Sequence, residues 1–243
     1  MKVYGQTDKG MVRETNQDYI CFGKFSDNVP WAIVCDGMGG SSSGDVASKV
    51  AAQSIRENIE KLYKSGMHPS NLKNLLLASV NIANINVFDL ANEDEKHKGM
   101  GTTVVAAILK EGVASIVNVG DSRAYIIGEN EVTQLTKDHS MVQELIDQGK
   151  ITKEEAETHP KKNIITRAVG ALKEVDADYT EVDISPGDKL LLCTDGLTNC
   201  LSAGKISEIV FSEEDPEKIC EKLIEAANER GGPDNISCVY ISE

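Results

Sequence analysis

The chain has 243 residues, of which 40% are hydrophobic, so it is long enough to bury a substantial core. Its formal net charge of −14 disfavours nucleic acid and anionic membrane surfaces as partners, because either would need a basic face. The N-terminus lacks the apolar stretch of a signal peptide, and no apolar run approaches the length of a membrane span. These features predict a cytoplasmic protein that binds neither nucleic acid nor membrane.

The first third of the chain is expected to hold three strands followed by two helices. The strand-like runs cover residues 2–7, 19–23 and 31–35, with turn residues between the later two. Apolar residues at helical spacing predict a helix over about 45–64 and a second over about 70–91, with Ser70 as its N-cap.

The middle of the chain predicts four strands in quick succession, over residues 102–109, 114–119, 124–127 and 131–135. The short connections between them, including residues 120–123, predict antiparallel hairpins. Residues 140–167 then break the pattern with a polar, Lys- and Glu-rich segment that holds a short helix. We interpret this segment as an excursion from the sheet.

The last part of the chain predicts two strands, two helices and a final strand, over residues 177–183, 189–194, 203–211, 216–228 and 236–241. Helices therefore cluster into pairs and strands into meanders, which disfavours a parallel βαβ architecture. We expect antiparallel sheet with helices packed outside it. No internal repeat or Pro/Gly linker is present, so a single domain over residues 1–243 is predicted.

Cysteine and histidine patterns give no zinc site. The six cysteines are scattered without a Cys-x-x-Cys pair, and four of them lie in or beside strand-like segments, so buried free thiols are expected. The four histidines have no partner at zinc-ligand spacing, and we expect them to be solvated; they are His68, His97, His139 and His159.

Five aspartates follow or end strand-like runs, namely Asp18, Asp36, Asp121, Asp195 and Asp234. Strands that share a sheet can bring such ends together from distant parts of the chain. Carboxylates gathered within a few ångströms raise each other's pKa unless divalent cations neutralise them. The pattern therefore predicts a site for hard metal ions.

Two of these aspartates are the strongest indication of a metal site. Asp36 and Asp195 each end a buried apolar run and each precede a glycine, which lets a carbonyl such as that of Gly37 approach an ion. A single Asp-Gly step is more often a simple turn, whereas two at the ends of buried strands are harder to dismiss. Asp121 is the weakest of the five on local grounds. Arg13 could bind phosphate oxygens, although a surface arginine is the default reading.

The ordered set of motifs closely resembles the bacterial metal-dependent serine/threonine protein phosphatases of the type 2C family. The resemblance spans essentially the whole chain. The motifs are Arg13 to Asp18, Val34-Cys35-Asp36-Gly37-Met38-Gly39-Gly40, Gly101-Thr102-Thr103, Val119-Gly120-Asp121-Ser122-Arg123, Thr136-Lys137-Asp138-His139-Ser140, Thr166-Arg167-Ala168-Val169-Gly170, Thr194-Asp195-Gly196-Leu197 and Pro233-Asp234-Asn235.

The resemblance implies an α+β fold, a four-layer αββα sandwich with two central antiparallel sheets flanked by helix pairs. It also implies a site for two Mn²⁺ or Mg²⁺ ions at one end of the sandwich. By the family pattern, Asp36 bridges both ions, the Gly37 carbonyl binds one of them, and Asp195 with Asp234 completes the other. Asp18 acts through a metal-bound water, and Asp121 joins Asp195 at a third, weaker ion.

The implied reaction is hydrolysis of phosphoserine and phosphothreonine in proteins. A hydroxide bound between the two ions attacks phosphorus directly, and Arg13 holds the substrate phosphate. Eukaryotic relatives carry a histidine where this chain has Met38, so no general acid is assigned there. Residues 140–167 correspond to the flap of bacterial members, which is expected to influence substrate choice, with His159 as a candidate contributor.

The implied partners are phosphoproteins and a cognate bacterial serine/threonine kinase, and a monomer is expected. Two alternatives stay open. One is a pseudophosphatase that binds phosphoproteins without turnover, although the complete set of aspartates argues against it. The other is a two-metal phosphoesterase for small substrates, which a comparison of phosphopeptide and nucleotide hydrolysis distinguishes.

Overall fold

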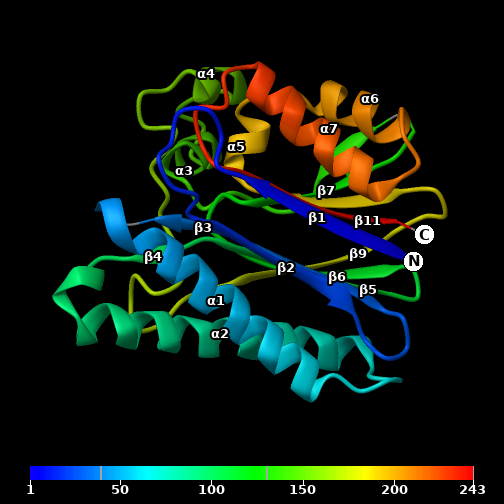
Figure 1. The fold of residues 1–243 in the computed structure, drawn as a ribbon, viewed down its shortest axis with the longest axis horizontal. Helices are drawn as coiled ribbons and strands as arrows, with labels where there is room; N and C mark the ends of the chain where they lie inside the picture. The colour runs from blue at the N-terminus through cyan, green and yellow to red at the C-terminus, as the bar shows by residue number, and fades with distance from the viewer. Residues whose placement is uncertain (39, 130, 243) are drawn as a thin grey trace.

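Two antiparallel sheets stacked face to face form the centre of the molecule (Figure 1). The computed structural model describes residues 1–38, 40–129 and 131–242. The first sheet has the order β1-β11-β10-β7-β8, with bounds Lys2–Asp8, Ile236–Ser242, Lys189–Cys193, Arg123–Ile127 and Val132–Gln134. The second has the order β2-β3-β5-β6-β9, with bounds Asp18–Lys24, Pro30–Met38, Val104–Lys110, Val113–Val119 and Asp178–Asp183, and β4 (Gly101–Thr102) pairs with β3.

Helices cover the outer face of each sheet, which completes four layers and confirms the predicted αββα sandwich (Figure 1). The second sheet is covered by α1 (Gly40–Leu62) and α2 (Pro69–Glu93), followed by the 3₁₀ turn η1 (Glu95–His97). The first sheet is covered by α5 (Asp195–Thr198), α6 (Ala203–Phe211) and α7 (Pro216–Glu229).

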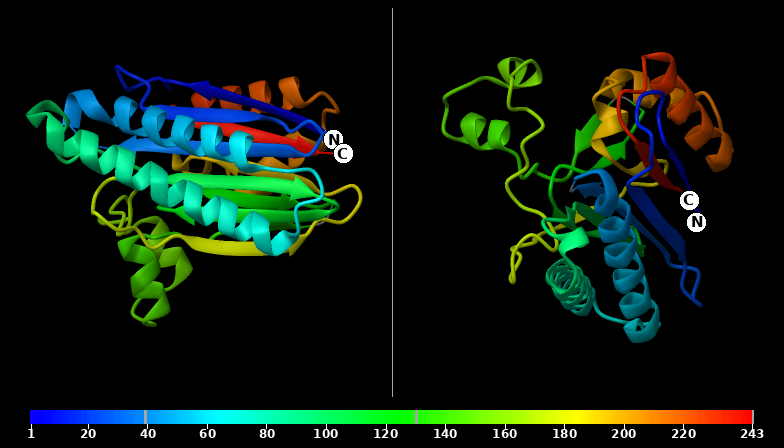
Figure 2. Two further views of the ribbon diagram at one scale, coloured as in Figure 1. Left: turned by 90° about the horizontal axis from the view of Figure 1, so that it is seen from below. Right: turned by 60° about the vertical axis from the view of Figure 1, so that its left-hand side comes forward.

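Residues 140–167 form an excursion that projects from the sandwich (Figure 2). It holds two short helices, α3 (Met141–Asp147) and α4 (Lys153–Glu157), where the sequence predicted one. The second helix has a capping box, in which the Thr152 side chain accepts from the Glu155 backbone and the Glu155 side chain accepts from the Thr152 backbone. This local signal stabilises a helix that has little apolar surface to bury.

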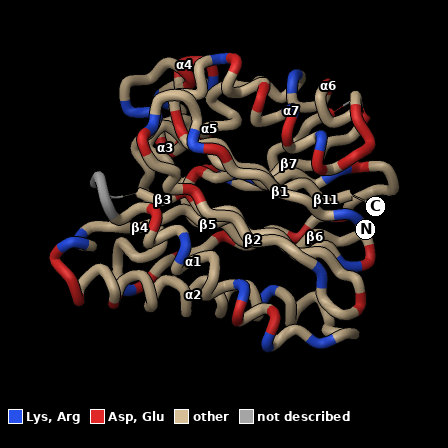
Figure 3. Tube along the Cα trace, in the orientation of Figure 1, with Lys and Arg blue, Asp and Glu red and all other residues tan. Residues whose placement is uncertain are grey.

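Three apolar clusters fill the spaces between the four layers. Strand β10 shows how one strand serves two of them: Leu191 packs under α6 and α7, while Leu190 and Leu192 pack between the sheets. Because side chains alternate along a strand and both faces are covered, the strand is apolar throughout. Most acidic residues lie on the helix layers and loops (Figure 3).

Two expectations about local structure are wrong. Residues 120–123 do not form a hairpin, because β6 belongs to the second sheet and β7 to the first, so the chain crosses between sheets there. The N-cap of α2 is His68, whose ring accepts from the Ser70 backbone, with Pro69 at the first helical position. Gly39 and Asn130, which belong to two predicted turns, lie outside the described residues.

The side chains of cysteine and histidine follow the prediction in part. Among the described residues all cysteines are free, and only Cys200 is not fully buried. The prediction that the histidines are solvated is wrong for His139, which is only 5% exposed. Its burial reflects partners on three segments, which are described below.

One helix reaches the length of a membrane span, contrary to expectation. Helix α2 has 25 residues and contains an 18-residue stretch of mean hydropathy 1.2. However, 44% of that stretch is buried inside the fold, where Leu76, Val80 and Ala83 are fully enclosed. A core helix of a globular domain passes the same test, so one such helix is weak support for a span.

The inter-sheet core gives a direct test of the packing. Leu192 is fully buried between the sheets, so Leu192→Ala should lower the free energy of unfolding by about 2–5 kcal/mol through lost burial and a residual cavity. Leu172→Ala is the control, because Leu172 is 70% exposed and should change stability little. Urea denaturation of both variants measures the difference, and equal midpoints would contradict the packing described here.

Candidate active site

Four of the five predicted aspartates line one cavity of about 530 Å³, namely Asp36, Asp121, Asp195 and Asp234. Arg13 and Gly37 line the same cavity. The fifth aspartate, Asp18, is buried directly behind it and faces Asp36 across the β2–β3 ladder. The structure therefore brings together every residue that the sequence placed in a site.

Antiparallel pairing explains why these positions meet. In such a pair the start of one strand lies beside the end of the other. Asp18 begins β2 and pairs in register with Asp36, near the end of β3. Asp195 follows the end of β10 and Asp234 precedes the start of β11, and these two strands are paired up to Cys193 and Cys238. One end of each sheet thus contributes two carboxylates.

The carboxyl group of Asp18 is held on one side only. Its Oδ2 accepts hydrogen bonds from Thr194 Oγ1 at 2.9 Å and from Ser237 Oγ at 2.7 Å. Its Oδ1 is buried and has no hydrogen-bond partner among the residues that the structure describes. A buried carboxylate oxygen without a donor is costly, so this atom is suited to a ligand from the cavity side.

The backbone of Asp36 is fixed by the two threonines of the Gly101-Thr102-Thr103 motif. Thr102 Oγ1 donates to the Asp36 carbonyl at 2.8 Å, and the Asp36 N–H donates to Thr103 Oγ1 at 3.0 Å. Thr103 Oγ1 also bonds Ser122 Oγ at 2.7 Å. The motif therefore ties Asp36 to the segment that carries Asp121.

The two Asp-Gly steps need glycine for lack of space. A Cβ on Gly37 would collide with the carbonyl oxygens of Gly44 and Gln17. A Cβ on Gly196 would collide with the Asn235 carbonyl oxygen. Neither glycine has a left-handed φ, so close backbone approach is the reason for both.

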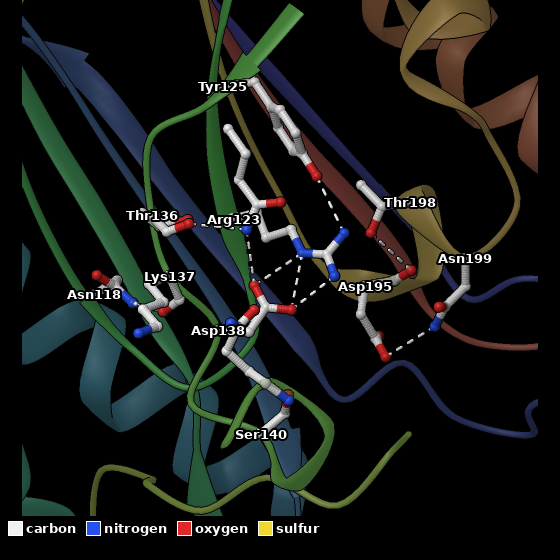
Figure 4. A network of polar contacts seen from close by, with 12 residues as sticks. Asn118, Arg123, Tyr125, Thr136, Lys137, Asp138, Ser140, Asp195, Thr198 and Asn199 are labelled. Carbon is white, nitrogen blue, oxygen red and sulfur yellow. Dashed lines mark hydrogen bonds and ion pairs between the residues drawn. The ribbon is translucent and has the colours of Figure 1, made fainter. Parts of the chain in front are cut away.

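A half-buried arginine, Arg123, lies beside Asp195 (Figure 4). The Arg123 guanidinium donates from Nε and Nη2 to the Asp138 carboxylate, with the shortest contact at 2.7 Å, and from Nη1 to Tyr125 at 3.2 Å. Asp195 is oriented separately, since its Oδ2 accepts from Asn199 Nδ2 at 3.0 Å (Figure 4). The positive charge of Arg123 partly offsets the negative potential at Asp195, whereas at Asp121 the charge of its partner Asp138 outweighs it.

The pKa values of the clustered carboxyl groups reflect their burial and their close spacing. Burial raises the pKa of Asp18 to about 7, although the hydrogen bonds from Ser237 and Thr194 act in the opposite direction. Burial and then the charge of Asp195 raise the pKa of Asp121 to about 7. The pKa of Asp36 lies well above its usual value because of burial and then the charges of Asp18 and Asp195. Burial, followed by the charge of Asp234, also raises the pKa of Asp195. A cation placed among these groups would reverse those shifts.

The donor set fits hard divalent cations. In the described part of the chain, no three His, Cys, Asp or Glu side chains are arranged closely enough to enclose an ion. Even so, the described residues that line the cavity include carboxylates but no Cys or His, and Asp18 Oδ1 behind them has no partner among the described residues. Oxygen-only ligands suit Mg²⁺ and Mn²⁺.

Arg13 reaches the cavity from the N-terminal segment. Its Nη2 donates to Asp234 Oδ2 at 2.7 Å, and its side chain is 51% exposed. The guanidinium is therefore held at the mouth of the cavity by one carboxylate while its remaining donors face solvent. A phosphate oxygen at the mouth could take those donors.

The sequence analysis did not identify the residue that holds the loop around Arg13 in place. Asn235 is buried, its Nδ2 donates to the carbonyls of Lys9 and Thr15, and its Oδ1 accepts from the Gln17 backbone. The sequence did not indicate this role, because Asp234-Asn235 after a proline is typical of an ordinary turn. Asn235 therefore aligns the loop that carries Arg13.

The projecting segment also reaches the cavity. Asn163 and Ile165 are among the lining residues, whereas His159 is not. His159 instead accepts from the Lys161 backbone through Nδ1 at 3.1 Å. The predicted contact of residues 140–167 with the site thus comes from the returning end of the segment.

Comparison with known proteins identifies the family. The protein phosphatase 2C profile matches residues 11–238. This chain belongs to the protein phosphatase 2C family. It is 38% identical over 236 residues to the serine/threonine phosphatase stp of Listeria monocytogenes serovar 1/2a, covering 97% of this chain and 93% of that protein. It is 36% identical over 242 residues to the protein phosphatase PhpP of Streptococcus pneumoniae strain R6, covering 100% and 97%.

Solved structures agree with the family assignment. The serine/threonine phosphatase Stp1 from Staphylococcus aureus superposes with a TM-score of 0.93 at 34% identity, covering 100% of this chain and 94% of that one. The phosphatase PstP/Ppp of Mycobacterium tuberculosis gives a TM-score of 0.88 at 33% identity, covering 100% and 98%. The sandwich is therefore the fold of bacterial serine/threonine phosphatases.

The raised pKa of Asp18 predicts how stability depends on pH without metal. The folded value of about 7 exceeds the ordinary 3.8, so the stabilising contribution is complete below about pH 4 and is lost as the pH rises through 7. Metal-free protein should therefore lose a few kcal/mol of unfolding free energy between about pH 5 and about pH 8. Asp18→Asn should flatten that slope, whereas Asp89→Asn, at an exposed position on α2, should not. Urea denaturation at several pH values measures the slopes, and parallel slopes for wild type and Asp18→Asn would contradict the assignment.

Proposed function

We propose that this chain, a metal-dependent serine/threonine protein phosphatase by family, binds two Mn²⁺ or Mg²⁺ ions in the carboxylate-lined cavity and hydrolyses phosphoserine and phosphothreonine there. The observation that carries the proposal is the convergence of Asp36, Asp195 and Asp234 on one cavity with Arg13 at its mouth. The raised pKa of Asp36, caused by burial and then by the charges of Asp18 and Asp195, supports it, because bound cations would stabilise the ionised carboxylates at neutral pH.

We assign the ligands by position. Asp36 would hold both ions, and the Gly37 carbonyl would bind one of them. Asp195 and Asp234, which lie at one end of the first sheet, would complete the second. Asp18 would contribute through water, which fits its Oδ1, an atom without a partner among the described residues. Asp121 would share a third, weaker ion with Asp195.

The chain's own residues then position the substrate. Bound divalent cations would supply Lewis acidity and lower the pKa of a water molecule enough to make it nucleophilic at neutral pH. Arg13 donates to the phosphate oxygens and orients phosphorus toward the cavity. Met38 lines the cavity and has no titratable proton, so the leaving alkoxide takes its proton from water rather than from that position.

The surrounding assignments complete the proposal. Residues 1–243 form a single catalytic domain, and residues 140–167 are a flap within it that influences substrate choice through Asn163 and Ile165. We further propose a monomeric, cytoplasmic enzyme that opposes a bacterial serine/threonine kinase. The net charge of −14 supports the exclusion of nucleic acid and anionic membrane as partners.

Metal dependence is the primary test. Metal-stripped protein should not hydrolyse a phosphothreonine peptide, and Mn²⁺ or Mg²⁺ should restore turnover that excess chelator removes. Asp36→Asn should lower kcat at least about 1000-fold at saturating metal, because the shared ligand is lost. Asp89→Asn is the charge-matched control and should retain wild-type turnover.

The same experiment separates the alternatives. Mn²⁺ binding without turnover of any phosphopeptide would indicate a phosphoprotein-binding role instead. Faster hydrolysis of a nucleotide or a diester than of the phosphopeptide would indicate a small-molecule phosphoesterase.

Arg13 should act on substrate binding. Arg13→Ala should raise KM about 10- to 100-fold with a smaller change in kcat, since a charge-assisted hydrogen bond to phosphate is lost in both ground and transition states. The metal concentration needed for half activation should not rise, because Asp234 loses its competing cation. Arg56→Ala, on the exposed side of α1, is the control. A loss confined to kcat with KM unchanged would show that Arg13 does not bind ground-state phosphate.

A further inference from the structure

His139 lies at the point where the flap, residues 140–167, leaves the body of the protein. Its backbone joins two segments: its N–H donates to the Gly120 carbonyl at 2.9 Å, and its carbonyl accepts from the Thr166 N–H at 2.8 Å. Gly120 immediately precedes Asp121, and Thr166 ends the flap. The backbone of one residue therefore contacts both the Asp121 turn and the returning end of the flap.

The imidazole ring repeats this bridge with its two nitrogens. Nδ1 accepts from the Gly120 N–H at 3.1 Å, so it carries no proton and the neutral ring is protonated at Nε2. Nε2 lies 3.3 Å from Asp178 Oδ2 on β9 and 3.3 Å from Arg167 Nη1 at the flap base. Because a guanidinium has only donors, the Nε2–H of the neutral ring faces the Asp178 carboxylate. Asp178 Oδ1 also accepts from Arg167 Nη1 at 2.9 Å, which fixes the flap base to the same carboxylate.

The turn that carries Asp121 depends on this contact, because the backbone of Gly120 is closely confined by its neighbours. Its φ is +101°, and a Cβ at this position would lie 2.6 Å from Thr103 Cγ2. Both backbone polar groups of Gly120 bond to His139. With His139 removed, the Gly120 N–H would be buried without a partner and the turn that aims Asp121 into the cavity would lose its support.

We propose that His139 is a positioning residue that fixes the Asp121 turn through Nδ1 and the flap base through Nε2. The positioning itself stands on the contacts above, whereas its consequence for metal binding rests on the proposed role of Asp121 as a ligand. One side chain thereby sets the geometry of the weakest proposed ion site and of the segment that borders the substrate.

Two conservative variants separate the halves of this bridge. His139→Asn keeps an acceptor near the position of Nδ1 but lacks a group at Nε2. His139→Gln keeps a polar group near Nε2 but lacks the acceptor at Nδ1. A residue with a merely structural role would not distinguish the two, because each variant removes a similar part of the ring.

The first readout is exchange of the Gly120 amide proton in metal-free protein, followed by NMR. We expect His139→Gln to accelerate it about fivefold or more, equivalent to one lost hydrogen bond, and His139→Asn to leave it near the wild-type rate. The second readout is trypsin cleavage within the flap after its four exposed lysines, Lys150, Lys153, Lys161 and Lys162. Here we expect the reverse, with faster cleavage in His139→Asn than in His139→Gln.

His68→Asn is the matched control, because His68 is exposed and caps α2 far from the flap, and neither readout should change. Asp178→Asn is the second flap-side variant in case a His139 variant does not fold. It should accelerate flap cleavage and leave Gly120 exchange unchanged. If Asp178→Asn accelerates Gly120 exchange, or if both His139 variants alter the two readouts alike, the proposal is wrong.

Mn²⁺ titration then tests the consequence for the weak ion. We expect His139→Gln to lose the same bound Mn²⁺ that Asp121→Asn loses, and His139→Asn to retain it. If wild type and Asp121→Asn bind equal amounts of Mn²⁺, the ligand role of Asp121 fails. The split between the two variants in exchange and cleavage would still uphold the positioning role of His139.

Discussion

Repulsion among carboxylates at one end of the sandwich is the constraint on which the rest of the site depends. The sheets bring Asp18, Asp36, Asp195 and Asp234 together by pairing strand ends. Burial, followed by the charges of neighbouring carboxylates, raises the pKa of Asp18 and Asp36. The fold tolerates this arrangement because the apolar clusters on both sides of each sheet hold the strands in register independently of the site. Stability supplied by the core is thus what allows an unfavourable cluster to exist until cations occupy it.

A layer of neutral and charged partners orients the carboxylates. Thr194 holds Asp18, Thr103 holds the backbone of Asp36, and Asn199 holds Asp195. Each contact leaves at least one oxygen free to face a ligand. The paired Arg123 adds a fixed positive charge beneath the cluster without entering the cavity. Such pre-organisation reduces the rearrangement needed when ions bind.

Much of the fold and most of the site could be predicted from the sequence, because the signals were local. Asp36 follows a continuous apolar strand and precedes glycine, which identifies a strand end that lies against other backbone. The connection at Asp121 was misread as a hairpin, because a short turn looks the same whether the next strand joins the same sheet or the opposite one. His139 was read as solvated, since its partners lie on three segments distant in sequence. Asn235 was hidden for the same reason.

Strand order has a consequence for how the protein is made. The last strand in the sequence, β11, lies between β1, the first, and β10, and it is completely buried. Until β11 leaves the ribosome, β1 has no neighbour in its sheet, and the Asp195 end of β10 lacks the strand that places Asp234 beside it. The half of the site on the first sheet therefore cannot assemble during synthesis of the preceding chain. A nascent chain would be unable to act on phosphoproteins until β11 has emerged from the ribosome.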